Sequence, residues 1–245
     1  MRSVQIGRVD LLAYVRAFGL LARNPQIALA PLLASVVTIL LFMLLPAEAG
    51  SGFLGSANSS IASLLAQLIA SFGFAVALIV AETAWRRGRA PFDDAWDDAR
   101  RKLGQIVFAA FGINFVVYVA GIVGSFLGPI GAIALTLIAY VFFIYTIPAA
   151  AIGGIPGGAA LNASVERAKR TLLATVLITV VYLAKTIYLP TLIIEALNPL
   201  LLGNSVFASG VVISLLRAVI ESIFTGYVAL VLAKMYDDAS YGRSY

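Results

Sequence analysis

Cysteine and histidine are both absent from the chain, which has 245 residues. Disulfides, zinc sites built on thiolates or imidazoles, and histidine-ligated haem are therefore excluded, and we expect neither a metal nor a cofactor. Charged residues are also few, at 12% against about 25% in soluble domains, whereas hydrophobic residues reach 61% against about 45–50%. A soluble fold of this size could not bury so much apolar surface, but a bilayer accepts it. The composition therefore predicts an all-α polytopic membrane protein.

Uncharged stretches predict six transmembrane helices, because a charged side chain at the bilayer centre costs at least about 2.5–3.5 kcal/mol. The uncharged stretch 103–165 is too long for one helix, and we divide it at Gly128-Pro129, since neither residue continues a helix well. We expect one membrane domain over residues 1–245, with a polar cytoplasmic tail at 234–245. Residues 190–202 form either the kinked end of the fifth span or an interfacial segment on the outer surface. The expected spans are about 26–45, 61–81, 103–126, 130–152, 171–189 and 205–233.

Lysine and arginine are confined almost entirely to one side of the expected spans. Fifteen of the 17 lie before the first span, between spans two and three, between spans four and five, or after span six. Because Lys and Arg in short loops stay on the cytoplasmic side, we expect a protein of the inner, cytoplasmic membrane of the cell with both termini in the cytoplasm. The net charge of +5 then has a topogenic origin, and we expect no nucleic-acid partner.

Three segments on this charged side share one pattern. Residues 9–23, 91–103 and 157–172 each place apolar side chains beside charged ones, as cytoplasmic amphipathic helices at a membrane surface do. Aligning Ala99-Arg100-Arg101 with Ala168-Lys169-Arg170 superposes the second and third segments. We therefore predict a repeated unit, an amphipathic helix followed by a membrane hairpin, present three times in parallel. The charge bias of cytoplasmic loops alone would also produce this similarity.

The chain resembles a known membrane family at several short motifs. These are Arg23-Asn24-Pro25, residues 82–88, and Ile147-Pro148 with the downstream residues Ala159, Ser164 and Arg170. They are similar to the six-span membrane domain attached to some glycerophosphodiester phosphodiesterases, which also has free-standing relatives of unknown function. The resemblance implies a six-helix fold. It does not imply the hydrolase activity, because the catalytic domain of that family is a separate barrel that uses histidine and carboxylates.

Arg217 and Glu221 are the most informative charged residues, because they lie four apart inside the sixth expected span and share one helix face. An ionic group within a membrane faces the protein interior or water and is a functional hypothesis by default. The alternative, which we favour from the sequence, is a self-neutralising pair that fixes helix packing.

Three further polar residues are candidates for an intramembrane site. Lys185 lies five residues before Pro190, so its ammonium could extend to the outer interface along its own stem. Glu82 ends the second span, at a depth expected to be close to that of Glu221. It is either a proton or cation site or a solvated carboxylate beside arginines. Asn114, like Gln67, could hydrogen-bond to a neighbouring helix.

Small residues at four-residue spacing predict close helix contacts. They occur in the second and third spans and comprise Gly73, Ala77 and Ala81, and Ala120, Gly124 and Gly128. The acidic run 93–98 lacks the glycine turn of a calcium loop and precedes three basic residues. We therefore interpret it as a solvated helix face whose charges suit the helix dipole.

Two function classes remain open. No phosphate loop, dinucleotide fingerprint or nucleophile paired with a base occurs in the sequence, so we expect a protein that is not an enzyme. The favoured hypothesis is a scaffold or accessory subunit of a larger membrane complex, whose partners are the lipid bilayer and other membrane subunits. The alternative is a transporter or lipid-handling protein that uses the intramembrane charges of spans five and six.

Overall fold

The computed structural model describes residues 11–44, 53–89, 91–201 and 206–241. Within these ranges the chain is all-helical and contains no strand. The N-terminal part comprises α1 (Leu11–Arg23), the 3-10 helix η1 (Pro25–Ala28), α2 (Leu29–Leu44) and α3 (Phe53–Arg87). The middle part comprises α4 (Phe92–Arg101), α5 (Leu103–Ser125), α6 (Gly128–Phe143) and α7 (Thr146–Ala151). The C-terminal part comprises α8 (Gly157–Arg170), α9 (Leu172–Leu201) and α10 (Val206–Tyr241).

Six stretches of the described chain are helical, long and apolar enough to cross a membrane. The protein is thus an all-α polytopic membrane protein, and the number of spans expected from the sequence is confirmed. The stretches are Pro25–Leu44, Ile61–Arg87, Leu103–Ser125, Gly128–Ala151, Leu172–Ile193 and Ile213–Ala239.

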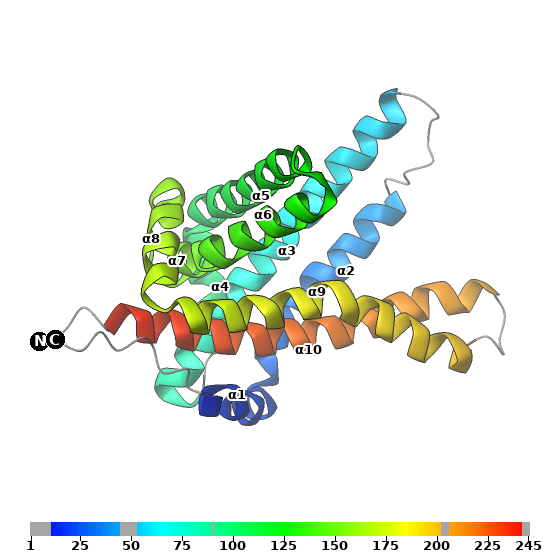
Figure 1. Cartoon of the computed structure of the whole chain (residues 1–245). Coiled ribbons are helices and arrows are strands. Elements are labelled where there is room, and N and C mark those ends of the chain that lie inside the picture. The colour runs from blue at the N-terminus through cyan, green and yellow to red at the C-terminus, as the bar shows by residue number, and fades with distance from the viewer. Residues whose placement is uncertain (1–10, 45–52, 90, 202–205, 242–245) are drawn as a thin grey trace, which may run out of the picture.

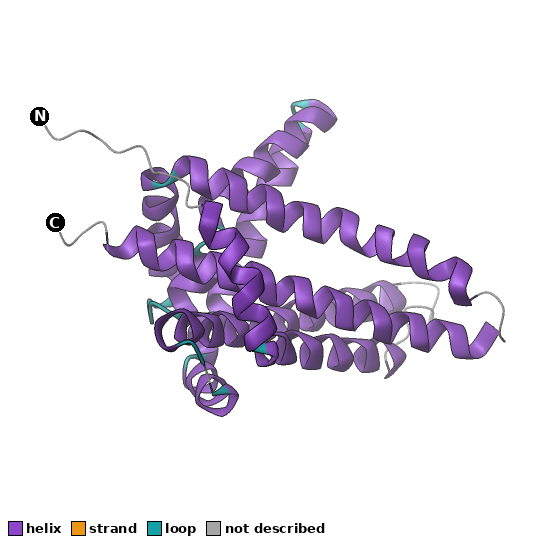
Figure 2. Cartoon of the chain, turned by 90° about the horizontal axis from the view of Figure 1, so that it is seen from below, coloured by secondary structure: helices purple, strands orange, loops and turns teal. Residues whose placement is uncertain are grey.

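The helices follow the order expected for three units. One short helix precedes each pair of spans: α1 precedes α2 and α3, α4 precedes α5 and α6, and α8 precedes α9 and α10. In Figure 1 the three hairpins extend from the end of the molecule where α1 and α8 lie and diverge toward the opposite end. The view from below shows the same divergence of the hairpins (Figure 2). The order of short helix and membrane hairpin therefore occurs three times along the chain.

The core lies where α3 and α10 cross. Residues 75–81 of α3 and 227–233 of α10 are all buried, and many of them are alanine or valine. Small side chains let helix backbones approach, which is the main source of stability where lipid offers no hydrophobic driving force. The Trp85 indole of α3 donates a 2.8 Å hydrogen bond to the backbone carbonyl of Leu230. These two helices therefore form the centre against which the other elements pack.

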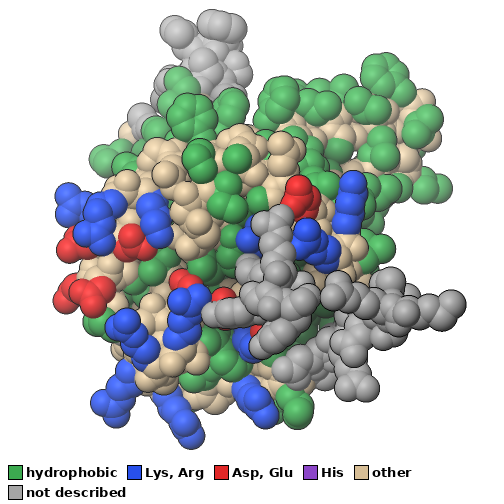
Figure 3. Space-filling view, turned by 90° about the vertical axis from the view of Figure 1, so that its left-hand side faces the viewer, with side chains coloured by type: hydrophobic (Ala, Val, Ile, Leu, Met, Phe, Trp, Pro, Cys, Tyr) green, Lys and Arg blue, Asp and Glu red, His purple; other side chains and the backbone are tan. Residues whose placement is uncertain are grey.

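Charged side chains gather at the end of the molecule that carries the short helices. Figure 3 views this end directly, and Lys, Arg, Asp and Glu side chains lie across it, while hydrophobic side chains occupy its margins. Large apolar side chains are exposed along the spans instead, among them Phe108, Phe115 and Tyr118 on α5. The surface thus divides into one charged end and a lipid-compatible body.

Helix α1 is held to the C-terminal helix by two tyrosines. The Tyr227 hydroxyl donates to the backbone carbonyl of Tyr14 at 3.3 Å, and the Tyr14 hydroxyl donates to Met235 Sδ at 3.8 Å. Burial raises the pKa of Tyr14 well above its ordinary value, with smaller contributions from Tyr145 and Tyr227. Tyr14 therefore stays a neutral hydrogen-bond donor across the physiological pH range.

Three expected boundaries differ from the structure. Helix α3 continues past the expected end at residue 81 to Arg87, because Glu82 is paired within the helix and does not terminate it. Helix α9 continues through Pro190 to Leu201, so this stretch is a continuation of the fifth helix. Residues up to Tyr241 belong to α10, so most of the expected polar tail is helical. Residues 242–245 and 202–205 lie outside the described residues.

The fourth span is broken, which the sequence division did not anticipate. Helix α6 ends at Phe143 and α7 begins at Thr146. Pro148 explains the break, because it has no N–H to donate to the carbonyl of Ile144 and its ring crowds that carbonyl. Ser164 of α8 compensates: its Oγ accepts from the backbone N–H of Tyr145 at 3.1 Å and donates to the carbonyl of Phe142 at 2.8 Å. Backbone groups freed within a membrane need such partners.

Candidate functional site

A cavity of about 580 Å³ lies between the first and third hairpins. Helices α2, α3, α9 and α10 form its walls, and Ile147 of α7 contributes one side chain. Its volume falls within the range of about 300–1,000 Å³ that is typical of small-molecule sites. The apolar part of the lining includes Pro31, Ile39, Phe42 and Phe74.

Three charged side chains line this cavity: Lys185 of α9, and Arg217 and Glu221 of α10. The Nε–H of Arg217 donates to Glu221 Oε1 at 2.7 Å, so the ion pair expected from the four-residue spacing is formed. The two side chains are 40% and 24% exposed, which leaves part of each accessible from the cavity. Lys185 faces the same cavity from α9. The three charged groups therefore form one cluster at the cavity wall.

Polar lining residues of four helices lie at a similar depth. Each lies within about three residues of the middle of its helix, or about 5 Å at about 1.5 Å per residue. These residues are Thr38 of α2, Gln67 of α3, Lys185 of α9 and Glu221 of α10. The cluster is therefore well inside the spans, near the middle of the helices and away from the charged end.

Sequence reasoning missed most of the polar lining, although a signal for it exists. Polar residues recur at spacings of three or four on the inner face of each wall helix, as one helical face requires. Most members of this set carry hydroxyl groups, which lower the hydropathy of a span much less than charged groups do. The pattern is therefore hard to recognise in an apolar span. The stripes are Ser35 and Thr38, Gln67 and Ser71, Tyr182 and Lys185, and Ser214, Arg217, Glu221 and Thr225.

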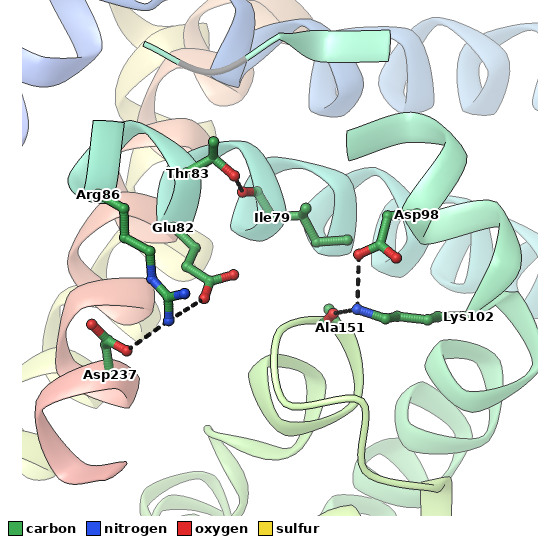
Figure 4. A network of polar contacts seen from close by, with 8 residues as sticks. All are labelled: Ile79, Glu82, Thr83, Arg86, Asp98, Lys102, Ala151 and Asp237. Atoms are coloured by element: carbon green, nitrogen blue, oxygen red, sulfur yellow. Dashed lines mark hydrogen bonds and ion pairs between the residues drawn. The ribbon is translucent and has the colours of Figure 1, made fainter. Parts of the chain in front are cut away.

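Glu82 does not belong to this cavity. Its carboxylate pairs with Arg86 at 2.8 Å, and the same Arg86 nitrogen lies 3.3 Å from Asp237 of α10 (Figure 4). Asp237 is 16 residues beyond Glu221 on α10, about 24 Å along a helix that rises about 1.5 Å per residue. The expectation that Glu82 and Glu221 share a depth is therefore wrong, because Glu82 lies at the charged end.

A second polar network lies at this charged end. The Lys102 ammonium contacts Asp98 at 2.8 Å and donates to the carbonyl of Ala151, also at 2.8 Å, which joins α4 to the end of α7 (Figure 4). A cavity of about 220 Å³ lined by Glu82, Arg86, Asp94 and Asp98 separates the two networks. An ion pair between α3 and α10 and a hydrogen bond from Lys102 to Ala151 account for this arrangement without a ligand.

The remaining expected residues have structural positions. Asn114 is exposed and donates to the carbonyl of Ala110 in its own helix at 2.9 Å, so it does not link two helices. Gly124 allows the tight crossing of α5 and α6, because a Cβ there would lie 2.5 Å from the carbonyl oxygen of Gly131. A Cβ on Gly73 would lie 2.7 Å from Ala34 Cβ, and Ala77 is fully buried.

Two of the small residues contribute differently from expectation. Gly128 has a φ of 84°, and an added Cβ would meet nothing within 4 Å, so this glycine serves the turn between α5 and α6 and not helix packing. Ala120 is partly exposed on α5. Sequence reasoning also overlooked Gly157, where a Cβ would lie 2.5 Å from Phe108 Cβ and block the contact of α8 with α5.

Comparisons of the chain with protein-family models, with curated proteins and with solved structures gave no match. The similarity to the membrane domain of glycerophosphodiester phosphodiesterases therefore stays a prediction from the motifs.

Proposed function

We propose that this protein binds a ligand within the membrane, in the cavity between α2, α3, α9 and α10, as a transporter or lipid-handling protein. The observation that carries the proposal is the convergence of polar stripes from four helices on one cavity. A packing role would account for the Arg217–Glu221 pair by itself. A packing role gives no reason for Lys185, from another helix, to line the same cavity. Ionisable side chains within a membrane are costly and usually mark a functional site.

The proposal includes an orientation. Because Lys and Arg of short loops remain in the cytoplasm, we place the charged end of the molecule, with α4 and α8, on the cytoplasmic side of the inner membrane. The cavity then lies within the bilayer, away from the cytoplasmic surface. We propose that the protein binds or transfers its ligand without altering it chemically, so that no catalytic step is required.

A scaffold or accessory subunit is the second candidate. One observation favours it: α5 presents a row of large exposed side chains, Phe108, Phe111, Phe115 and Tyr118, that no described element covers. Another membrane protein could cover such a row, but so could lipid tails. This candidate predicts a stoichiometric protein partner and no dependence on the cavity.

Intact purification in mild detergent tests the proposal. Native mass spectrometry of the wild type should detect a bound small molecule or lipid, and Thr38→Trp, which fills the cavity from α2, should lose it. Val37→Trp is the matched control, because Val37 is 47% exposed and is not part of the cavity lining. Equal ligand retention in both variants, or a protein partner in place of any ligand, would favour the scaffold.

A further inference from the structure

The cavity carries an excess of positive charge. Its lining contains two cations, Lys185 and Arg217, but Glu221 is the only carboxylate among the described lining residues. The ion pair neutralises one cation and leaves a net charge of +1. An uncompensated charge is costly within the low-dielectric interior of a membrane protein, and such charges pair with an opposite charge where one is available. Here the missing partner is an anion.

The geometry leaves donors available for that anion. The guanidinium of Arg217 has five N–H donors, and the 2.7 Å bond to Glu221 uses the one on Nε. The remaining donors can form a planar fork that fits a phosphate or carboxylate group, while a lysine ammonium supplies a point charge. Among the described residues, no carboxylate lies within ion-pair distance of Lys185.

The apolar part of the lining indicates what else the anion carries. Ile39, Phe42 and Phe74 line the same space as the three charges. A small hydrated ion would leave these side chains in contact with water, whereas an attached hydrocarbon chain would cover them. The cavity thus joins a cationic cluster to an apolar wall.

We propose that the ligand of this cavity is an amphiphilic anion, with a singly charged phosphate or carboxylate group held between Lys185 and Arg217 and an apolar chain against α2 and α3. The inference rests on the proposed function and specifies its ligand. Glu221 holds the Arg217 side chain in position and limits the charge that the site accepts to one.

Charge variants with opposite expected effects test the inference. The purified protein is titrated in detergent with short-chain phosphatidylglycerol, which is anionic, and with phosphatidylcholine of equal chain length, which is zwitterionic. Lys185→Gln should weaken phosphatidylglycerol binding about tenfold or more, since it removes a charged hydrogen-bond partner, and Lys185→Arg should restore it. Glu221→Gln should strengthen binding, because the glutamine Oε1 can still accept from Arg217 Nε–H while the net charge of the site rises from +1 to +2. A cation site would show the reverse signs and would overturn the inference.

A second arm separates a lipid anion from a free one. Inorganic phosphate added at millimolar concentration should not displace phosphatidylglycerol. Displacement would mean that the anion needs no apolar chain, and would overturn that part of the inference. Equal binding of the two lipids, lost in Thr38→Trp, would overturn the choice of an anion while the proposed function stands. Absence of any cavity-dependent ligand would contradict the proposed function itself.

Discussion

Arg217 Nε and Glu221 Oε1 lie 2.7 Å apart, one helical turn from each other on α10, at the wall of the membrane cavity. The Thr225 hydroxyl, one turn further along α10, donates to the backbone carbonyl of Glu221 at 2.7 Å. Both side chains are partly exposed, so the ion pair is neither fully solvent-exposed nor fully buried. Its contributions to stability and to binding can therefore be separated.

A double-mutant cycle on this pair should give unequal effects on stability and on ligand binding. Arg217→Leu or Glu221→Leu alone should lower the free energy of unfolding by about 1–3 kcal/mol, the cost of leaving one charged partner unsatisfied. This is less than the about 3–5 kcal/mol of a fully buried pair. The double variant Arg217→Leu/Glu221→Leu should recover most of the stability but bind no ligand. Unfolding in detergent and native mass spectrometry provide the two measurements. Wild-type stability of both single variants would mean that the two side chains do not stabilise each other.

Cysteine labelling should report the orientation, and the absence of native cysteine makes the wild type a suitable background. A cysteine at Leu127, which is 72% exposed at the turn between α5 and α6, should react with an impermeant maleimide added to intact cells. A cysteine at Asn162 on α8 should react only after permeabilisation. Neither change alters a charged residue, so the topogenic signal stays intact. The opposite labelling pattern would reverse the proposed orientation.

The six spans could be predicted from sequence because length and apolarity alone decide what crosses a bilayer. The ends of the spans could not be predicted as well, since a single charged residue or proline can either end a helix or lie within it. Glu82 does not end its helix because Arg86 lies one turn away to pair with it. Pro190 does not end α9, and prolines are tolerated within membrane helices. Pro148, in contrast, coincides with a break, because Ser164 is positioned to satisfy the freed backbone groups.

The cavity could not be predicted in the same way. Its walls come from four helices that are far apart in the sequence, so their packing has to be known before the polar stripes can be matched. The charged pair itself was predictable, because four-residue spacing is a local property of one helix. The position of Lys185 at the same cavity was not predictable, since a long lysine side chain in a span can also extend to the membrane interface.

Removal of the Ser164 hydroxyl should destabilise the break between α6 and α7. Ser164→Ala leaves the buried backbone N–H of Tyr145 and the carbonyl of Phe142 without this partner, at a cost of about 1–3 kcal/mol. Ser125→Ala is the control, because the Ser125 hydroxyl is exposed and bonds only within its own helix turn, to the carbonyl of Ile122. Thermal unfolding in detergent should separate the two variants. Equal melting temperatures would show that the break does not depend on Ser164.

Two glycine substitutions in α5 should differ clearly in their effect on stability. Gly124→Ala places a Cβ 2.5 Å from the carbonyl oxygen of Gly131 and 2.6 Å from Ala132 Cα, both backbone atoms that cannot move without separating α5 from α6. We expect a loss of about 1–3 kcal/mol, as in other overpacked interiors. Gly104→Ala, near the start of the same helix, has nothing within 4 Å of its Cβ and should be neutral or stabilising by up to about 1 kcal/mol, because alanine favours the helix. Denaturation of both variants in one detergent measures the difference. A stable Gly124→Ala variant would mean that the two helices do not cross closely at this glycine.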